Sequence, residues 1–184
     1  MIITDQRLSS TELQLLGRLA HQTWRSISGS SMLSFTFAWE DIRISTSDFS
    51  IELRLRSAPL DIDGHVDDYP TLGVGAVPAD VPPHPSGNTY YQGQNEKVHE
   101  ILVLRDVVQG ERHGTPFFKN SADIAVAIRL DSSWLVFCRA SHFMNGFDVQ
   151  QVAQLGDAEL PITTDEWEST LEYRYSLSRE WIRV

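Results

Sequence analysis

The sequence predicts an α+β fold in which one N-terminal helix packs on a mainly antiparallel, curved sheet arranged as a meander. Three observations lead to this prediction. Apolar and polar residues alternate in several segments, short turn signals join successive segments, and the clearest helical spacing lies near the N-terminus. The length of 184 residues predicts a single domain over residues 1–184.

The helix is predicted from its start signal and its apolar stripe. Ser9 and Glu12 are spaced as a capping box, in which each side chain binds a backbone N–H group of the other residue. Apolar residues then recur at steps of three and four: Leu13, Leu16, Ala20, Trp24 and Ile27. Gly29 stands where the chain would leave the helix. We therefore expect one helix that covers most of residues 9–29.

Strand spacing begins at residue 32, where every second residue is apolar: Leu33, Phe35, Phe37 and Trp39. Further strands are predicted over residues 49–57, 97–109, 122–130, 134–143 and 171–184. Residues 131–133 predict a tight hairpin, and Asn145-Gly146 predicts a turn because both residues accept a positive φ. Residues 147–155 fit either another strand or a helix, and residues 161–169 fit a short helix.

Residues 57–95 predict a long Pro/Gly-rich loop. The segment holds six of the eight prolines, and proline both fixes φ and removes a hydrogen-bond donor. A loop of this length in a compact domain is usually functional or disordered. Residues 71–78 in its middle fit a short strand.

The composition excludes several broad classes. A net charge of −10 disfavours nonspecific binding of nucleic acid, which needs a basic surface. The one cysteine, Cys138, cannot form an intramolecular disulfide. The N-terminal residues do not resemble a signal peptide, and no apolar run is long enough to span a membrane. We therefore expect a cytoplasmic protein that binds neither nucleic acid nor a membrane.

The negative charge is concentrated in two short segments, residues 61–80 and 157–168. Each segment holds five acidic residues and no Lys or Arg, whereas the rest of the chain has fifteen residues of each sign. Aromatic residues among acids are typical of binding hot spots for a basic partner. The predicted partner-binding residues are Asp61, Asp63, Asp67, Asp68, Tyr69, Asp157, Glu159, Asp165, Glu166, Trp167 and Glu168.

Catalytic and metal-binding interpretations of the same residues are weaker. Gly64 follows Asp63 directly, so the order of residues in a calcium-binding EF-hand loop is not met. Asp67 and Asp68 are adjacent in a polar stretch where nothing evident separates their pKa values. Cys138 and His142 lie about 13 Å apart on a strand, which is too far for a nucleophile and its base. We expect no catalytic residue, no metal and no cofactor.

The leading functional hypothesis is a non-enzymatic protein-binding module with a focused acidic surface. An immunity protein or antitoxin that neutralises a basic toxin has these requirements. One alternative is a small-molecule-binding or enzymatic β-barrel-like domain that uses His99, His113 and His142, with the long loop as its lid. The other is a metal-dependent hydrolase built on the acidic loop at residues 61–68.

Overall fold

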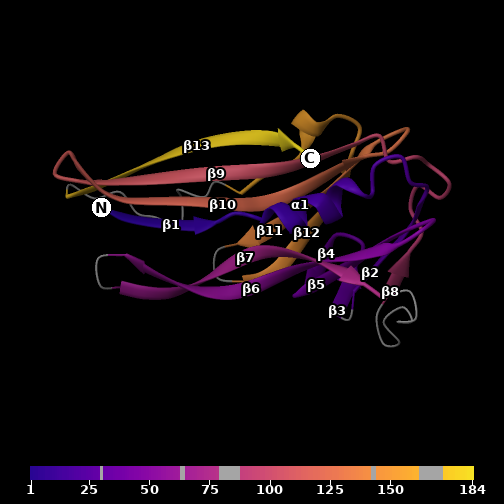
Figure 1. Ribbon diagram of the computed structural model, residues 1–184, viewed down its shortest axis with the longest axis horizontal. Helices are drawn as coiled ribbons and strands as arrows, with labels where there is room; N and C mark the ends of the chain where they lie inside the picture. Colours follow the sequence, from indigo (N-terminus) through magenta and orange to yellow (C-terminus); the bar gives the residue numbers. More distant parts are fainter. Residues whose placement is uncertain (30, 63–64, 79–87, 142–143, 162–171) are drawn as a thin grey trace.

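The computed structural model describes residues 1–29, 31–62, 65–78, 88–141, 144–161 and 172–184, and strands dominate these residues (Figure 1). One sheet contains β1 (Ile2–Gln6), β3 (Ser31–Ser34), β4 (Phe37–Trp39), β9 (Glu100–Arg112), β10 (Thr115–Arg129), β11 (Trp134–Ser141), β12 (Met144–Val152) and β13 (Tyr173–Arg183). The other contains β2 (Trp24–Gly29), β5 (Asp41–Thr46), β6 (Ser50–Ile62), β7 (His65–Val77) and β8 (Asn88–Tyr90).

The pairing of these strands confirms a mainly antiparallel architecture. The eight-stranded sheet has the order β13-β9-β10-β11-β12-β4-β3, with β1 added to β10, and the five-stranded sheet has the order β7-β6-β5-β2-β8. Among the described residues, β1 with β10 is the one parallel pair. The eight-stranded sheet does not close on itself, and β13 and β3 are its ends. The predicted curvature stays a prediction.

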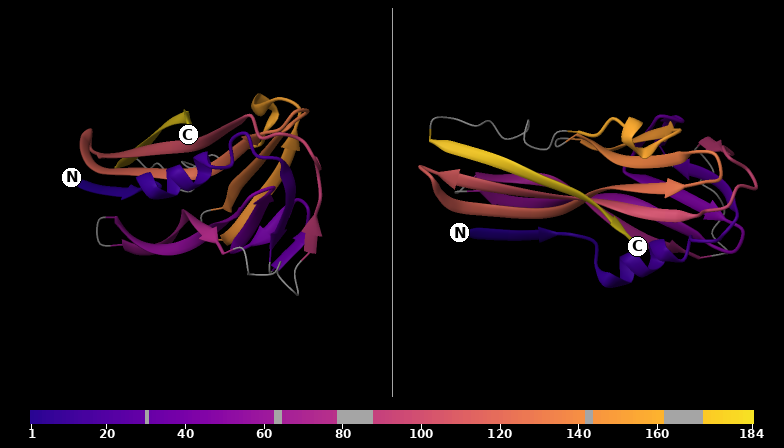
Figure 2. Two further views of the ribbon diagram at one scale, coloured as in Figure 1. Left: turned by 45° about the vertical axis from the view of Figure 1, so that its right-hand side comes forward. Right: turned by 90° about the horizontal axis from the view of Figure 1, so that it is seen from above.

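The two sheets form two layers, as the views in Figure 2 show. A large apolar cluster lies between them and includes Trp24, Ile44, Leu53, Val126 and Phe137. A second cluster lies on the other face of the eight-stranded sheet, because alternate residues of β10 and β11 belong to it. Residues 152–160 contribute four of the apolar side chains that pack against this second cluster: Val152, Leu155, Ala158 and Leu160. Both faces of the sheet are therefore covered where these strands cross.

Most of the predicted strands are confirmed, and so is the hairpin between β10 and β11. Residues 147–152 are strand and not helix. The turn predicted at Asn145-Gly146 is wrong, since both residues lie inside β12. Gly146 is needed there for packing: a Cβ atom on it would lie 2.6 Å from Cζ of Phe37. The helix predicted over residues 161–169 falls almost entirely outside the described residues.

The long loop predicted over residues 57–95 is wrong for its first part. Residues 57–62 continue β6, and β7 pairs with β6 over thirteen residues. Two of the six prolines that motivated the prediction occupy strand positions with a free side. Pro70 lies on β7, an edge strand, and Pro59 lies beyond the part of β6 that pairs with β5. A missing N–H group costs little where no neighbouring strand would accept it. Residues 79–87 lie outside the described residues.

The N-terminal helix is shorter than the sequence predicts. Helix α1 spans Ser10–Gly17 and begins with the predicted capping box of Ser9 and Glu12. It does not reach residue 29, because His21 has a φ of 67° and Trp24–Gly29 form β2. Strand β2 lies between β5 and β8, and nearly all its residues are buried. A strand that is buried on both faces lacks the alternation of apolar and polar residues by which a strand is recognised in a sequence.

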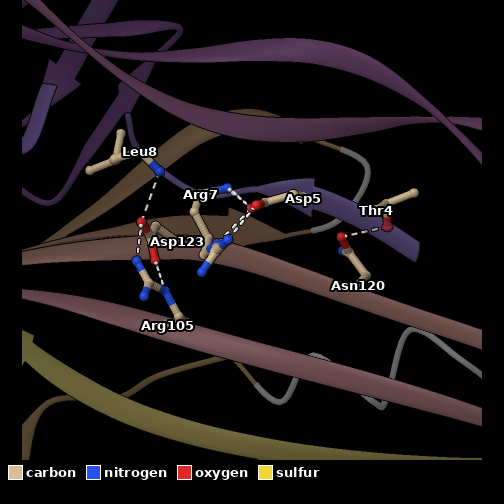
Figure 3. Close-up of polar contacts among 7 residues, drawn as sticks. All are labelled: Thr4, Asp5, Arg7, Leu8, Arg105, Asn120 and Asp123. Atoms are coloured by element: carbon tan, nitrogen blue, oxygen red, sulfur yellow. Dashed lines mark hydrogen bonds and ion pairs between the residues drawn. The ribbon is translucent and has the colours of Figure 1, made fainter. Parts of the chain in front are cut away.

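Strand β1 was not predicted, and polar contacts fix it against the eight-stranded sheet (Figure 3). The Thr4 hydroxyl donates to the Asn120 side chain at 2.8 Å. The buried carboxylate of Asp123 accepts the backbone N–H of Leu8 at 2.8 Å and two N–H groups of Arg105. A buried carboxylate needs such partners, so the chain after β1 has one favoured position. No helix among the described residues is long and apolar enough to cross a membrane.

Glu12 joins α1 to the edge of the other sheet, which generates a prediction. Its carboxylate accepts N–H groups from Ser9 and, at 3.0 Å, from Val74 of β7. Burial raises the pKa of Glu12, but these hydrogen bonds and the charge of Arg56 outweigh burial and lower it overall. Glu12→Ala should therefore lower the free energy of unfolding by about 1 kcal/mol near neutral pH.

The pH dependence of this loss identifies its cause. Because the pKa is lowered on folding, the stabilisation is complete above the unfolded value of about 4.3 and is lost as pH falls through the folded value. The free energies of unfolding of wild type and variant, measured in urea, should therefore become equal in acid. Thr11→Ala, at an exposed neighbour in the same turn, is the control. A difference that persists unchanged in acid would contradict the account.

Candidate functional site

The structure separates the two acidic segments. Asp61 is exposed near the β6–β7 turn of the five-stranded sheet. Asp157 and Glu159 are exposed in and just after the short 3-10 helix η1 (Leu155–Asp157), which follows β12 of the other sheet. In the views of Figures 1 and 2, η1 lies well away from the free end of the β6–β7 hairpin. The described members of the two segments therefore do not form one surface.

Several predicted residues cannot be placed as surface contacts. Asp67 and Asp68 pair with Leu60 and Pro59 in the β6–β7 ladder, but their side chains lie outside what the structure describes. The residues that lie entirely outside the described part are Asp63, Asp165, Glu166, Trp167 and Glu168.

Tyr69 lies inside the protein and is only 1% exposed. The guanidinium of Arg139 lies over its ring at 4.4 Å and donates to its hydroxyl at 3.0 Å. Arg139 is itself buried on β11, so the pair links β7 to the eight-stranded sheet. Tyr69 thus stabilises the packing of the two sheets, and we remove it from the proposed partner-binding surface.

The second acidic segment is placed by its apolar residues and by one glutamine. Leu155, Ala158 and Leu160 pack on the outer apolar cluster of the eight-stranded sheet. Gln150 of β12 then fixes the backbone of Glu159: its side-chain amide donates to the Glu159 carbonyl at 2.6 Å, and its oxygen accepts the Glu159 N–H at 2.8 Å. The Glu159 carboxylate is left exposed at a defined position.

A groove of about 470 Å³ lies between this segment and β12, and we call it the acidic groove. Its lining combines polar and apolar side chains: Thr36, Ala140, Asp148, Val149, Gln150, Glu159, Leu160 and Pro161. Asp148 lies on β12 opposite Cys138 on one side and Phe37 on the other. Its side chain therefore points to the outer face, away from the core between the sheets.

Asp148 is a half-buried carboxylate without a compensating cation in the described part of the chain. Burial raises its pKa above the ordinary value. No described side chain donates a hydrogen bond to it. Arg179, which donates to the carbonyl of the groove residue Pro161, gives its other N–H groups to Asp106 at 2.7 and 2.8 Å.

The fully buried carboxylates among the described residues are compensated by arginines. Asp106 and Asp123 are buried, and each is held by two N–H groups of one arginine. Asp131 is bonded to His99 at 2.5 Å, and this contact helps to lower the pKa of Asp131. The half-buried Asp148 and the exposed Glu159 thus distinguish the acidic groove as a place for an external cation.

An aromatic pair lies beside the groove. Phe37 and Trp39 are alternate residues of β4, and their rings are in edge-to-face contact with centroids 5.0 Å apart. Both are half-buried and face the same side of the sheet as Asp148, because Phe37 pairs with Asp148. The sequence pattern predicted strand positions for Phe37 and Trp39 but did not identify Asp148 as a site residue. The signal in the sequence that could have identified Asp148 is a single carboxylate between the apolar residues Phe147 and Val149.

The structure offers little support for the alternative sites. His99 precedes β9 and His113 follows it, so the thirteen-residue strand keeps these side chains about 40 Å apart. His142 lies outside the described residues. No group of three or more metal-ligating side chains occurs within the part of the chain that the structure describes.

Comparison with known protein families, with curated proteins and with solved structures finds no match to this chain.

The state of Asp148 predicts that its removal stabilises the protein. A carboxyl with a raised folded-state pKa is disfavoured in its charged form, so its unfavourable contribution grows as pH rises past the unfolded value. Asp148→Asn should raise the free energy of unfolding by about 0.5 kcal/mol near neutral pH, a small value because the group is partly solvated. Asp157→Asn, at an exposed site, should change it less. Urea unfolding measures both, and a destabilised D148N protein would argue against an uncompensated charge.

Cys138 is predicted to be chemically inert in the folded protein. It is 1% exposed, and burial raises its pKa to about 12. Since the thiolate is the reactive form, iodoacetamide should label it at least about a hundredfold more slowly in the folded than in the urea-unfolded state. Mass spectrometry of timed samples gives both rates. Similar rates in the two states would show that the thiol is accessible.

Proposed function

We propose that the protein is a non-enzymatic binding module whose acidic groove docks a basic protein partner. The observation that carries this proposal is the half-buried, uncompensated carboxylate of Asp148, with the exposed Glu159 on the opposite wall of the groove. The specific class that we favour is an immunity protein or antitoxin that covers a basic toxin. Such a protein needs an acidic docking surface and no catalytic residues of its own.

The position of Asp148 makes it more effective than an exposed carboxylate. A Lys or Arg group about 4 Å away gains about 1 kcal/mol in bulk water, but about 4 kcal/mol at the effective dielectric constant of 20 typical near protein surfaces. Asp148 has already lost part of its hydration on folding. A partner's cation therefore regains interaction energy that the isolated protein lacks.

The surroundings of the groove fit a protein partner. Leu160 supplies apolar contact area within the groove, and Phe37 and Trp39 lie next to it. Aromatic side chains next to charged groups are typical of the residues that dominate binding energy at protein interfaces. The rigid backbone of β12 and the Gln150 clamp position these groups before a partner arrives.

The net charge of −10 supports fast association with a basic partner. Asp165, Glu166, Trp167 and Glu168 lie outside the described residues and stay predicted members of this surface. Asp61, Asp67 and Asp68 lie on β6 and β7 of the other sheet, and their charges, with that of Asp63, add to the overall field. The proposal does not require the two acidic segments to meet.

The test uses a short synthetic peptide of alternating Lys and Ala residues as a cationic probe. Backbone NMR signals of Val149, Gln150 and Glu159 should shift on titration, and the affinity should weaken steeply as salt rises. Asp148→Asn should weaken binding about five- to tenfold, because one close charge pair is lost.

The matched control is Asp61→Asn, which changes the net charge by the same amount on the other sheet. It should alter the affinity less than about twofold. Equal losses for D148N and D61N would mean that the peptide senses only overall charge, and the proposal would then fail. Signal changes confined to the β6–β7 hairpin would overturn it as well.

A further inference from the structure

Strand β13 is a long strand at one edge of the eight-stranded sheet. It forms one end of the eight-stranded sheet and pairs with β9 over all of its eleven residues. In the part of the chain that the structure describes, no strand pairs with its other side. Edge strands of this length are templates for pairing with another chain unless they are covered or interrupted. Neither a proline nor a bulge interrupts β13.

The direction of each backbone group along β13 follows from its ends. The His113 N–H donates to the Glu172 carbonyl, and the Val184 N–H donates to the Ile101 carbonyl. Because the register between these points is unbroken, even-numbered residues bond to β9. The odd-numbered residues from Tyr173 to Arg183 therefore direct their N–H and C=O groups away from the sheet.

Two charged side chains on the strand have no ion-pair partner among the described residues. Arg174 and Glu180 are both exposed and point to the same face. Arg174 lies across from Glu111 of β9, and Glu180 lies across from Arg105, which is already bonded to Asp123.

We propose that two copies of this chain pair through β13, antiparallel and symmetric about Leu177, so that their eight-stranded sheets become one continuous sheet. In this register Leu177 faces its own copy, and Arg174 of each chain faces Glu180 of the other. The direction of the backbone groups fits this register. Leu177 is an odd-numbered residue, so its N–H and C=O groups point away from β9, and the two copies exchange hydrogen bonds at the symmetry axis.

Charge selects this register over its neighbours. Pairing of the outward backbone groups allows only symmetric registers centred on a single residue. Shifting the centre to Ser176 or Ser178 places Arg174 opposite Ser178 or Ile182 and removes both ion pairs. With the centre at Leu177, Arg174 and Glu180 are directly opposed in a non-hydrogen-bonded pair, where side chains lie closest. A row of alternating charge then crosses the interface: Asp123, Arg105, Glu180, then Arg174 and Glu111 of the second copy.

Sedimentation velocity over a range of protein concentrations tests the pairing. Wild type should form a reversible dimer. Glu180→Arg places like charges opposite each other twice and should raise the dissociation constant at least about tenfold. The double variant R174E/E180R restores opposite charges and should return it to within about threefold of wild type. Both positions are exposed, so circular dichroism should show an unchanged fold.

Amide hydrogen exchange distinguishes this dimer from any other. The amides of Ser176 and Ser178 should be protected at all concentrations, since they bond to β9. The amides of Tyr175, Leu177 and Arg179 should gain protection only when the dimer forms. A monomer at every concentration would overturn the inference. A dimer that is insensitive to charge reversal, or that leaves the odd-numbered amides unprotected, would do the same.

Discussion

The central constraint on this structure is that the eight-stranded sheet carries apolar residues on both faces. Alternate residues of β10 and β11 belong to different clusters: Val126 and Phe137 face the five-stranded sheet, and Ala127 and Cys138 face the opposite side. A sheet of this kind is stable only if both faces are removed from water. The five-stranded sheet covers one face. The segment that follows β12 covers part of the other, and this requirement brings residues 152–161 back over the sheet.

The acidic groove is a consequence of that second cover. Leu155 and Leu160 direct their side chains into the outer cluster, and the short segment between them carries Asp157 and Glu159 on its exposed side. The same folding step partly covers Asp148, whose charge no described residue compensates. Arginines compensate the buried carboxylates of Asp106 and Asp123, so Asp148 differs from these two residues. A site that costs stability in the free protein is the kind of site that a partner can occupy with gain.

The sequence predicts correctly those elements that have one solvent-exposed face and one buried face. Alternation identified most of β6, β9, β10, β11 and β13, and the capping box identified the start of α1. The prediction failed for strands that are buried on both faces and for strands that pair with a segment far away in the sequence. Inner strand β2 is buried almost throughout, and β1 depends on contacts more than a hundred residues away, such as Leu8 with Asp123. Of the candidate site, Asp157 and Glu159 were found from charge density, whereas Asp148 depends on what folds over it.

The most direct test of the account is the pKa of Asp148, measured from the carboxyl carbon shift in an NMR titration of the free protein. The account predicts a midpoint above the ordinary aspartate value of about 3.9, because burial is uncompensated. On addition of a cationic partner the midpoint should fall. A midpoint at or below the ordinary value in the free protein would mean that the chain already stabilises the charged carboxylate. The groove would then not be expected to bind a partner's cation.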